Sequence, residues 1–150
     1  MSATDLANRI LDEEEGVTAH VIRDSRGYLT IARGCLVDPS VPCDGLCQEA
    51  IAVQSAHDLA TAVASAQRLP GFQLANDVRQ AVLISMVFQL GSLDESEWPD
   101  FRAACGRGDW EAAAAAGRDS KWWRRQTHLR AEREMRMIES GAWIEAEDIR

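Results

Sequence analysis

The chain has 150 residues, 24 acidic and 16 basic side chains, a net charge of −8 and a hydrophobic content of 46%. A chain of this length forms one ordinary domain, which buries about 68 to 70% of the surface that its unfolded form exposes. The acidic balance argues against a nucleic-acid binder, because such proteins use basic patches to displace counterions from phosphates. We therefore expect a single globular domain over residues 1–150, monomeric and with no nucleic-acid partner.

The first fifteen residues are acidic, whereas a secretory signal peptide needs a basic start and then an apolar stretch. No apolar run approaches the roughly 20 residues that a membrane-spanning helix requires. These observations predict a protein that is made in the cytoplasm and does not insert into membranes.

The four cysteines, Cys35, Cys43, Cys47 and Cys105, suit a reducing compartment and are too few for a disulfide scaffold. Three of them lie close to His57 in the sequence, so a zinc site is conceivable. Neither a C-x2-C pair nor an H-x3-H partner is present, however. We prefer the simpler interpretation of small buried or half-buried thiols, with no metal.

Apolar residues at positions 6, 10 and 11 follow a capping residue at Thr4 or Asp5. This pattern predicts a short amphipathic helix that ends by Gly16. From about 17 to 37, apolar and polar residues alternate on both sides of the turn-like run RDSRG. The alternation predicts a β-hairpin or a three-stranded meander.

Residues 38–45 contain two prolines and a glycine and are expected to form a loop. A long alanine-rich helix is predicted over 46–67, ended by Pro70 and Gly71. Asn76 then caps the segment DVRQAVLISMVFQLG. It is apolar on nearly every side, as expected of a helix in the middle of a core. Shorter helices are predicted around 99–105, after Asp109 to Gly117, and over 127–139.

These elements predict a mainly helical α+β fold with two lobes. A small β-containing lobe would span about 12–45, a connecting helix about 46–67, and a helical lobe about 68–150. Helical periodicity dominates the chain, and the alternating pattern is confined to its first quarter.

Candidate chemistry lies near the β-rich segment. Four consecutive acids, 12–15, end the first predicted helix, where the macrodipole disfavours negative charge. Asp24 follows in the turn, and Thr30 lies on the returning strand. A carboxyl at a helix end and a second one on a facing hairpin can flank a bound chain, as glycoside hydrolysis requires. On spacing alone, solvated acids and an aspartate that shapes a turn are the simpler explanation.

The spacing of Glu15, Asp24 and Thr30, together with the run GYLTIARG, resembles the catalytic segment of the phage-type lysozymes, glycoside hydrolase family 24. The apolar run LISMVFQLG is similar to that family's central buried helix. Four further motifs, W-E-A-A, K-W-W, T-H-L-R-A-E-R and S-G-A-W, follow in the family's order. The resemblance covers nearly the whole chain.

This resemblance implies a two-lobed lysozyme fold that binds peptidoglycan glycan strands between its lobes. Glu15 would be the general acid that protonates the oxygen between N-acetylmuramic acid and N-acetylglucosamine. Asp24 and Thr30 would orient the attacking water, which implies an inverting mechanism. No metal and no organic cofactor enters such a mechanism.

The resemblance also suggests supporting residues. Arg130 resembles the arginine that pairs with the family's catalytic glutamate, although a surface arginine fits the sequence equally well. Leu36 and Phe88 match positions that line the sugar cleft, and Phe88 fits a core position equally well. Gln89 is polar inside an apolar run, so its amide needs partners, which sugar groups in a cleft would supply.

The chain departs from the family at 30–35, where it has T-I-A-R-G-C instead of T-I-G-x-G-H. The leading hypothesis is a muramidase, a phage or prophage endolysin held in the host bacterial cytoplasm until another protein permeabilises the membrane. The altered segment favours an alternative, a lysozyme fold that no longer cleaves and serves as a wall-binding or particle-associated structural module. A helical interaction domain without any link to sugars is a further alternative, but it leaves the β-rich segment without a role.

Overall fold

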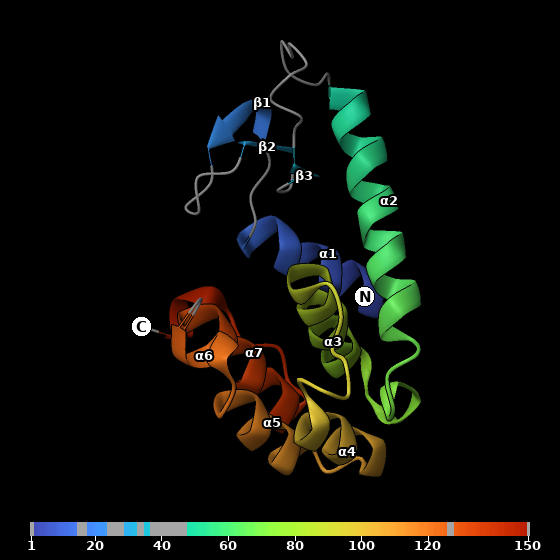
Figure 1. Cartoon of the computed structure of the whole chain (residues 1–150), viewed down its shortest axis with the longest axis vertical. Coiled ribbons are helices and arrows are strands. Elements are labelled where there is room, and N and C mark those ends of the chain that lie inside the picture. Colours follow the sequence, from blue (N-terminus) through green and yellow to red (C-terminus); the bar gives the residue numbers. More distant parts are fainter. Residues whose placement is uncertain are drawn as a thin grey trace.

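The structure is a computed structural model that describes residues 2–14, 18–23, 29–32, 35–36, 48–125 and 128–149. For a few of these, Leu36 among them, only the backbone is described. The chain is mainly helical with one small antiparallel sheet (Figure 1), which confirms the predicted α+β class.

Helix α1, Ala3–Glu14, carries the predicted apolar stripe and buries it against α3. Its cap differs from the prediction, because Ser2 rather than Thr4 or Asp5 precedes the first turn. Ser2 Oγ accepts a hydrogen bond from the Asp5 amide at 3.2 Å, and the Asp5 carboxylate accepts one from the Ser2 amide at 2.9 Å. This reciprocal arrangement is a capping box with aspartate in the third helical position. Asp5 therefore belongs to the cap but does not start the helix.

The predicted meander is confirmed by strands β1, Thr18–Arg23, β2, Leu29–Ala32, and β3, Cys35–Leu36. They form an antiparallel sheet in the order β1-β2-β3. Thr30, in the central strand, pairs with Ile22 on one side and with Leu36 on the other. The predicted loop at 38–45 and most of the predicted turn lie outside the described residues.

Helix α2, Gln48–Ala66, is the predicted connecting helix. It contacts β2 near its start and packs against α3 farther along, so it links the sheet to the helical part of the molecule (Figure 1). A short 3-10 turn, η1 at Phe72–Leu74, follows it and leads into α3. The sheet and the helices thus meet through one long element.

Helix α3, Asp77–Leu90, lies at the centre of the helical part and packs against α1, α2 and α7. Asn76 caps its start by accepting a hydrogen bond from the Arg79 amide at 3.1 Å, and Gly91 ends it with a φ of 81°. Every residue of 81–87 is buried. The prediction of a helix apolar on nearly all sides is therefore confirmed.

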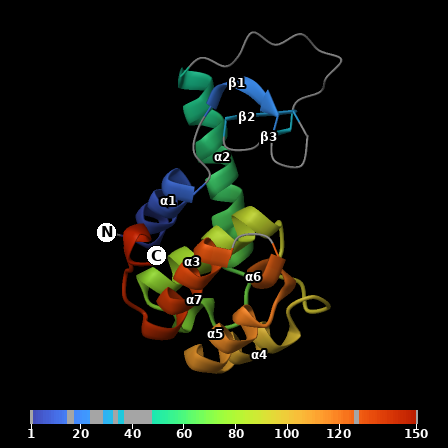
Figure 2. The same ribbon diagram turned by 90° about the vertical axis from the view of Figure 1, so that its left-hand side faces the viewer.

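The remaining helices lie in the part of the molecule away from the sheet (Figure 2), and α7 among them packs against α3. They are α4, Pro99–Arg107, α5, Trp110–Arg118, α6, Lys121–Arg125, α7, His128–Ser140, and the 3-10 turn η2, Ala146–Ile149. Helix α6 was not predicted, because five residues are too short for an apolar period to show. Ser120 begins it by accepting a hydrogen bond from the Trp123 amide at 3.2 Å.

We predict that Gly71→Ala destabilises the protein much more than Gly91→Ala. Both glycines have positive φ, 79° and 81°, which disfavours any other residue, and in the left-handed region of Gly71 the cost to a side chain is about 1 to 2 kcal/mol. A Cβ at Gly71 would also overlap the carbonyl oxygen of Cys105, whereas a Cβ at Gly91 meets nothing within 4 Å. Denaturant unfolding should show a loss of about 3 kcal/mol or more for Gly71→Ala. Equal losses in the two variants would contradict the close approach between Gly71 and α4.

Candidate functional site

The sheet holds two of the residues predicted to act on sugars. The side chain of Thr30 is buried in the central strand, and the backbone of Leu36 pairs with it from β3. The proposed acid and base, Glu15 and Asp24, lie outside the described residues, as does the side chain of Leu36. The described part of this lobe therefore places Thr30 in the middle of the sheet, between two paired strands.

The helical lobe holds the other predicted residues. Gln89, near the end of α3, accepts a hydrogen bond from the indole nitrogen of Trp122 at 2.9 Å through Oε1. Trp122 is itself buried and packs edge-on against Trp98. Phe88 is half-buried and packs against the core. The polar residue in the apolar run thus has an internal partner for its oxygen, and Phe88 contributes to core packing.

A buried arginine explains two of the four consecutive acids. Arg133, on α7, is 1% exposed. Its guanidinium lies 2.8 Å from Glu13 Oε2 and donates a hydrogen bond to Glu14 Oε1 at 3.2 Å. The acids at the unfavourable end of α1 are therefore stabilised by a cation from a distant helix. Glu14 directly precedes the proposed acid, Glu15, in the sequence. The end of α1, which carries Glu14, is therefore fixed to α7.

The same arginine ties the C-terminal segment to α1. Arg133 Nε donates a hydrogen bond to the carbonyl of Ile144 at 2.8 Å. The guanidinium groups of Arg133 and Arg9 both lie over the ring of Trp143, 5.1 and 4.5 Å from its centroid. Arg9 also pairs with Glu145 at 2.7 Å. Residues 143–145, α1 and α7 thus form one connected polar and aromatic cluster.

Arg130 lies one turn before Glu134 on the buried face of α7. Glu134 is fully buried, and its Oε1 accepts hydrogen bonds from Ser85 Oγ at 2.7 Å and from Arg130 Nε at 3.2 Å. Arg130 Nη2 in turn contacts Ser85 Oγ at 3.1 Å. The sequence left open whether Arg130 is a surface arginine. The structure buries it, in a triangle with a carboxylate and a hydroxyl.

Burial raises the pKa of Glu134 above its ordinary value, because desolvation disfavours the charged form. The nearby charge of Glu14 adds to the increase, while Arg130 and the Ser85 hydroxyl oppose it. Glu134 Oε2 is buried and accepts no hydrogen bond within the described part of the chain. A buried carboxylate of this kind is costly for stability unless it is well paired.

The cysteine and membrane predictions concern residues away from this cluster. Cys105 is free and buried, and burial raises the pKa of its thiol to about 12. Cys43 and Cys47 lie outside the described residues, and Cys35 is described only in its backbone. In the described ranges we find no group of three or more metal-binding side chains, and no helix long and apolar enough to cross a bilayer.

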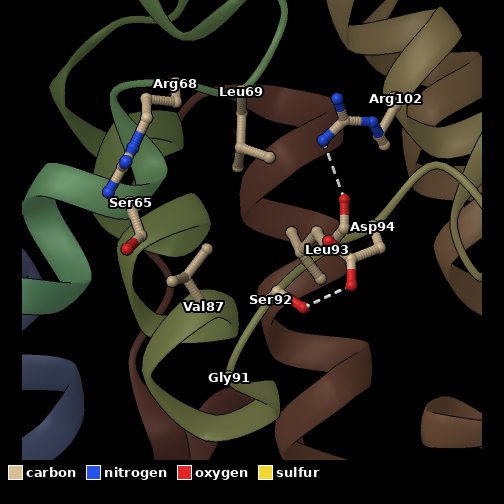
Figure 3. Close-up of a pocket in the computed structure, with 9 residues that line it drawn as sticks. All are labelled: Ser65, Arg68, Leu69, Val87, Gly91, Ser92, Leu93, Asp94 and Arg102. Carbon is tan, nitrogen blue, oxygen red and sulfur yellow. Dashed lines mark hydrogen bonds between the residues drawn. The ribbon is translucent and has the colours of Figure 1, made fainter.

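A cavity of about 280 Å³ lies where α2 and α3 end (Figure 3). Arg68 and Ser65 line one side and Arg102 the other. Arg102 donates hydrogen bonds to the Leu93 carbonyl and to Glu95, both at 2.8 Å, so it holds the loop that follows α3. None of the residues predicted to act on sugars lines this cavity. We therefore assign the cavity no part in the candidate site.

Four residues of these clusters, Ser85, Arg133, Glu134 and Trp143, were not among the predicted site residues. Two of them carried a recognisable pattern. Ser85 is a polar residue within an apolar helix, and Glu134 follows Arg130 by four residues, the spacing of neighbours on one helix face. The contacts of Arg133 with α1 had no such pattern, because they join residues 119 positions apart.

Comparison with known proteins connects part of the chain to a bacteriophage. No family model matches the sequence. Over 72 residues, 48% of this chain, the sequence is 40% identical to the pre-baseplate central spike protein Gp5 of Enterobacteria phage T4. The match covers only 12% of that protein's length. The similarity therefore supports a relation to phage proteins, and it leaves the activity of this chain to be proposed from its residues.

We predict that Arg133→Met lowers the free energy of unfolding by about 2 to 4 kcal/mol. The substitution removes the contacts with Glu13, Glu14 and the Ile144 carbonyl at once. Arg136→Met is the matched control on the same helix, since the Arg136 side chain is 49% exposed and pairs with Glu132 one turn away. It should cost less than about 1 kcal/mol. Similar losses in urea unfolding for the two variants would contradict the structural role of Arg133.

We predict that the free energy of unfolding of Glu134→Gln increases relative to that of the parent as the pH rises. A carboxyl whose folded-state pKa is raised destabilises the fold progressively above its unfolded value, which is 4.5. The difference in free energy of unfolding, variant minus parent, should therefore grow from about pH 4.5 towards neutral pH. Glu139→Gln, an exposed change on the same helix, controls for loss of a surface charge. A difference for Glu134→Gln that is flat or falls over this range would refute the raised pKa.

Proposed function

We propose that the protein is a muramidase that hydrolyses the β-1,4 bond between N-acetylmuramic acid and N-acetylglucosamine in bacterial peptidoglycan. The observation that carries the proposal is the anchoring of α1 by Arg133. Two acids that precede the proposed catalytic glutamate, Glu13 and Glu14, are held by a buried cation of the helical lobe. A general acid needs such a fixed position relative to the substrate, because proton transfer requires hydrogen-bond reach.

In this proposal Glu15 protonates the departing glycosidic oxygen. Asp24 and Thr30 orient a water that attacks the anomeric carbon from the opposite face, so the reaction inverts the configuration at that carbon. The burial of Thr30 in the central strand supports its part, since a strand paired on both sides positions a hydroxyl more firmly than a loop does. Gln89, Phe88 and Leu36 contribute to glycan binding in this proposal.

The phage relation bears on where such an enzyme acts. An endolysin held in the host cytoplasm until the membrane is permeabilised follows from the resemblance to phage-type lysozymes. The similarity to a phage spike protein favours a second candidate, in which the chain is a particle-associated module that binds the wall with or without cleaving it. Both candidates share the same ligand, the peptidoglycan glycan strand.

The test compares the parent with Glu15→Gln in clearing outer-membrane-permeabilised Gram-negative cells at low salt. Glu15→Gln is isosteric, so we expect a folded protein whose activity is at least about 100-fold lower, the lower end of the range of a general acid's contribution. Glu97→Gln, an exposed acid in the loop after α3, is the matched control and should clear as the parent does.

Two other outcomes would change the assignment. Clearing by both the parent and Glu15→Gln would show that Glu15 is not the acid. No clearing by folded parent protein would refute the muramidase and favour the binding module. Cosedimentation of the parent with purified peptidoglycan sacculi then tests that module directly, and a protein that stays in the supernatant would exclude it as well.

A further inference from the structure

Glu134 occupies a place where an apolar side chain would pack. The rest of the buried face of α7 includes Ala131, Met135 and Ile138, each 0% exposed. Glu134 is equally buried but carries a carboxyl group, one oxygen of which accepts no hydrogen bond within the described residues. Well-packed apolar residues are often as stable as a buried ion pair, or more so. The stability of the core therefore does not by itself explain why position 134 is a glutamate.

The hydrogen bonds of Glu134 within the described residues involve Arg130 and a hydroxyl that itself contacts Arg130. Its Oε1 accepts from Arg130 Nε at 3.2 Å, and it also accepts from Ser85 Oγ, which itself lies 3.1 Å from Arg130 Nη2. Two points of the planar guanidinium are thus fixed, one by the carboxylate and one by the hydroxyl. Because a guanidinium is rigid, two contacts of this kind set its orientation as well as its position.

We propose that Glu134, braced by Ser85, is the positioning residue for Arg130. It holds the guanidinium of Arg130 in a fixed orientation on the face of α7 that packs against α3. The consequence for catalysis rests on the proposed function and on the resemblance to phage-type lysozymes, which suggests that Arg130 pairs with the acid Glu15. There a displaced Arg130 slows the chemical step and leaves glycan binding unchanged.

Three substitutions at position 134 separate position from charge. Glu134→Gln removes the charge and keeps an acceptor oxygen at the same reach. Glu134→Asp keeps the charge and shortens the reach by one methylene. Glu134→Leu removes both. If Glu134 acts by position, Glu134→Gln should hold Arg130 as the parent does, and Glu134→Asp and Glu134→Leu should not. If only its charge matters, Glu134→Asp should hold Arg130 and Glu134→Gln should not.

The first measurement needs no activity. In 1H–15N spectra, the Nε–Hε signal of Arg130 is identified by its absence from Arg130→Lys. We expect its hydrogen exchange to accelerate about tenfold or more in Glu134→Asp and Glu134→Leu, and to stay within about threefold of the parent in Glu134→Gln. Glu139→Leu, the same change at an exposed position of α7, should leave the signal unchanged. Unaltered exchange in the Asp and Leu variants would overturn the proposal.

The second measurement is steady-state hydrolysis of purified peptidoglycan by folded protein, checked by thermal melts. We expect kcat to fall about 10- to 100-fold in Glu134→Asp, with KM within about twofold of the parent value. In Glu134→Gln we expect kcat to stay at the parent value. A parental kcat in the Asp variant, or a loss in KM alone, would overturn the proposal. A parent without hydrolytic activity would refute the proposed function, and the exchange measurement would then decide by itself whether Glu134 positions Arg130. If Glu134→Leu does not fold, the comparison of Glu134→Gln with Glu134→Asp still decides whether Glu134 positions Arg130.

Discussion

The burial of one guanidinium, that of Arg133, is the constraint on which the arrangement of the helical lobe depends. A buried cation must find anions or carbonyl oxygens, and Arg133 takes them from two separate segments: the acids that end α1 and the Ile144 carbonyl. Interactions within each segment do not explain its position. Three acids, Asp12, Glu13 and Glu14, at the C-terminus of α1 oppose the helix dipole, and residues 142–149 form no long element of their own. The arginine fixes both against α7.

Helix α7 therefore has two functions in the fold, on adjacent positions of one buried face. Arg133 joins the end of α1 and the Ile144 carbonyl to α7, while Arg130 and Glu134 form a hydrogen-bonded group with Ser85 of the central helix α3. The contacts of Arg133 are with partly exposed carboxylates, Glu13 and Glu14, and they stabilise the fold. The group of Arg130, Glu134 and Ser85 places a costly carboxylate inside the core. A costly group that contacts a cation next to a candidate site is more readily explained by the geometry it imposes than by stability.

The elements that could be predicted are those with a local cause. Asn76, a run of apolar residues and Gly91 mark both ends of α3, and alternation marks the strands around Thr30. The cap of α1 was misplaced because Ser2, Thr4 and Asp5 are all acceptable capping residues, and only the backbone geometry selects Ser2. The contacts of Arg133 and Glu134 could not be predicted, because partners about 50 to 120 positions apart leave no periodic pattern. Glu15 and Asp24 stay predictions, since they lie outside the described residues.

The cluster around Trp143 has a consequence for how the protein forms during synthesis. Helix α1 leaves the ribosome well before its partners Arg133, Trp143 and Glu145, which follow more than 115 residues later. A 12-residue helix is marginal in water without tertiary contacts. The contacts of α1 with Arg133, Trp143 and Glu145 therefore form only after residue 145 has been synthesised, whereas its apolar face can pack against α3 earlier. Glu13 and Glu14, which adjoin the proposed catalytic glutamate, gain their cationic partner only at that stage.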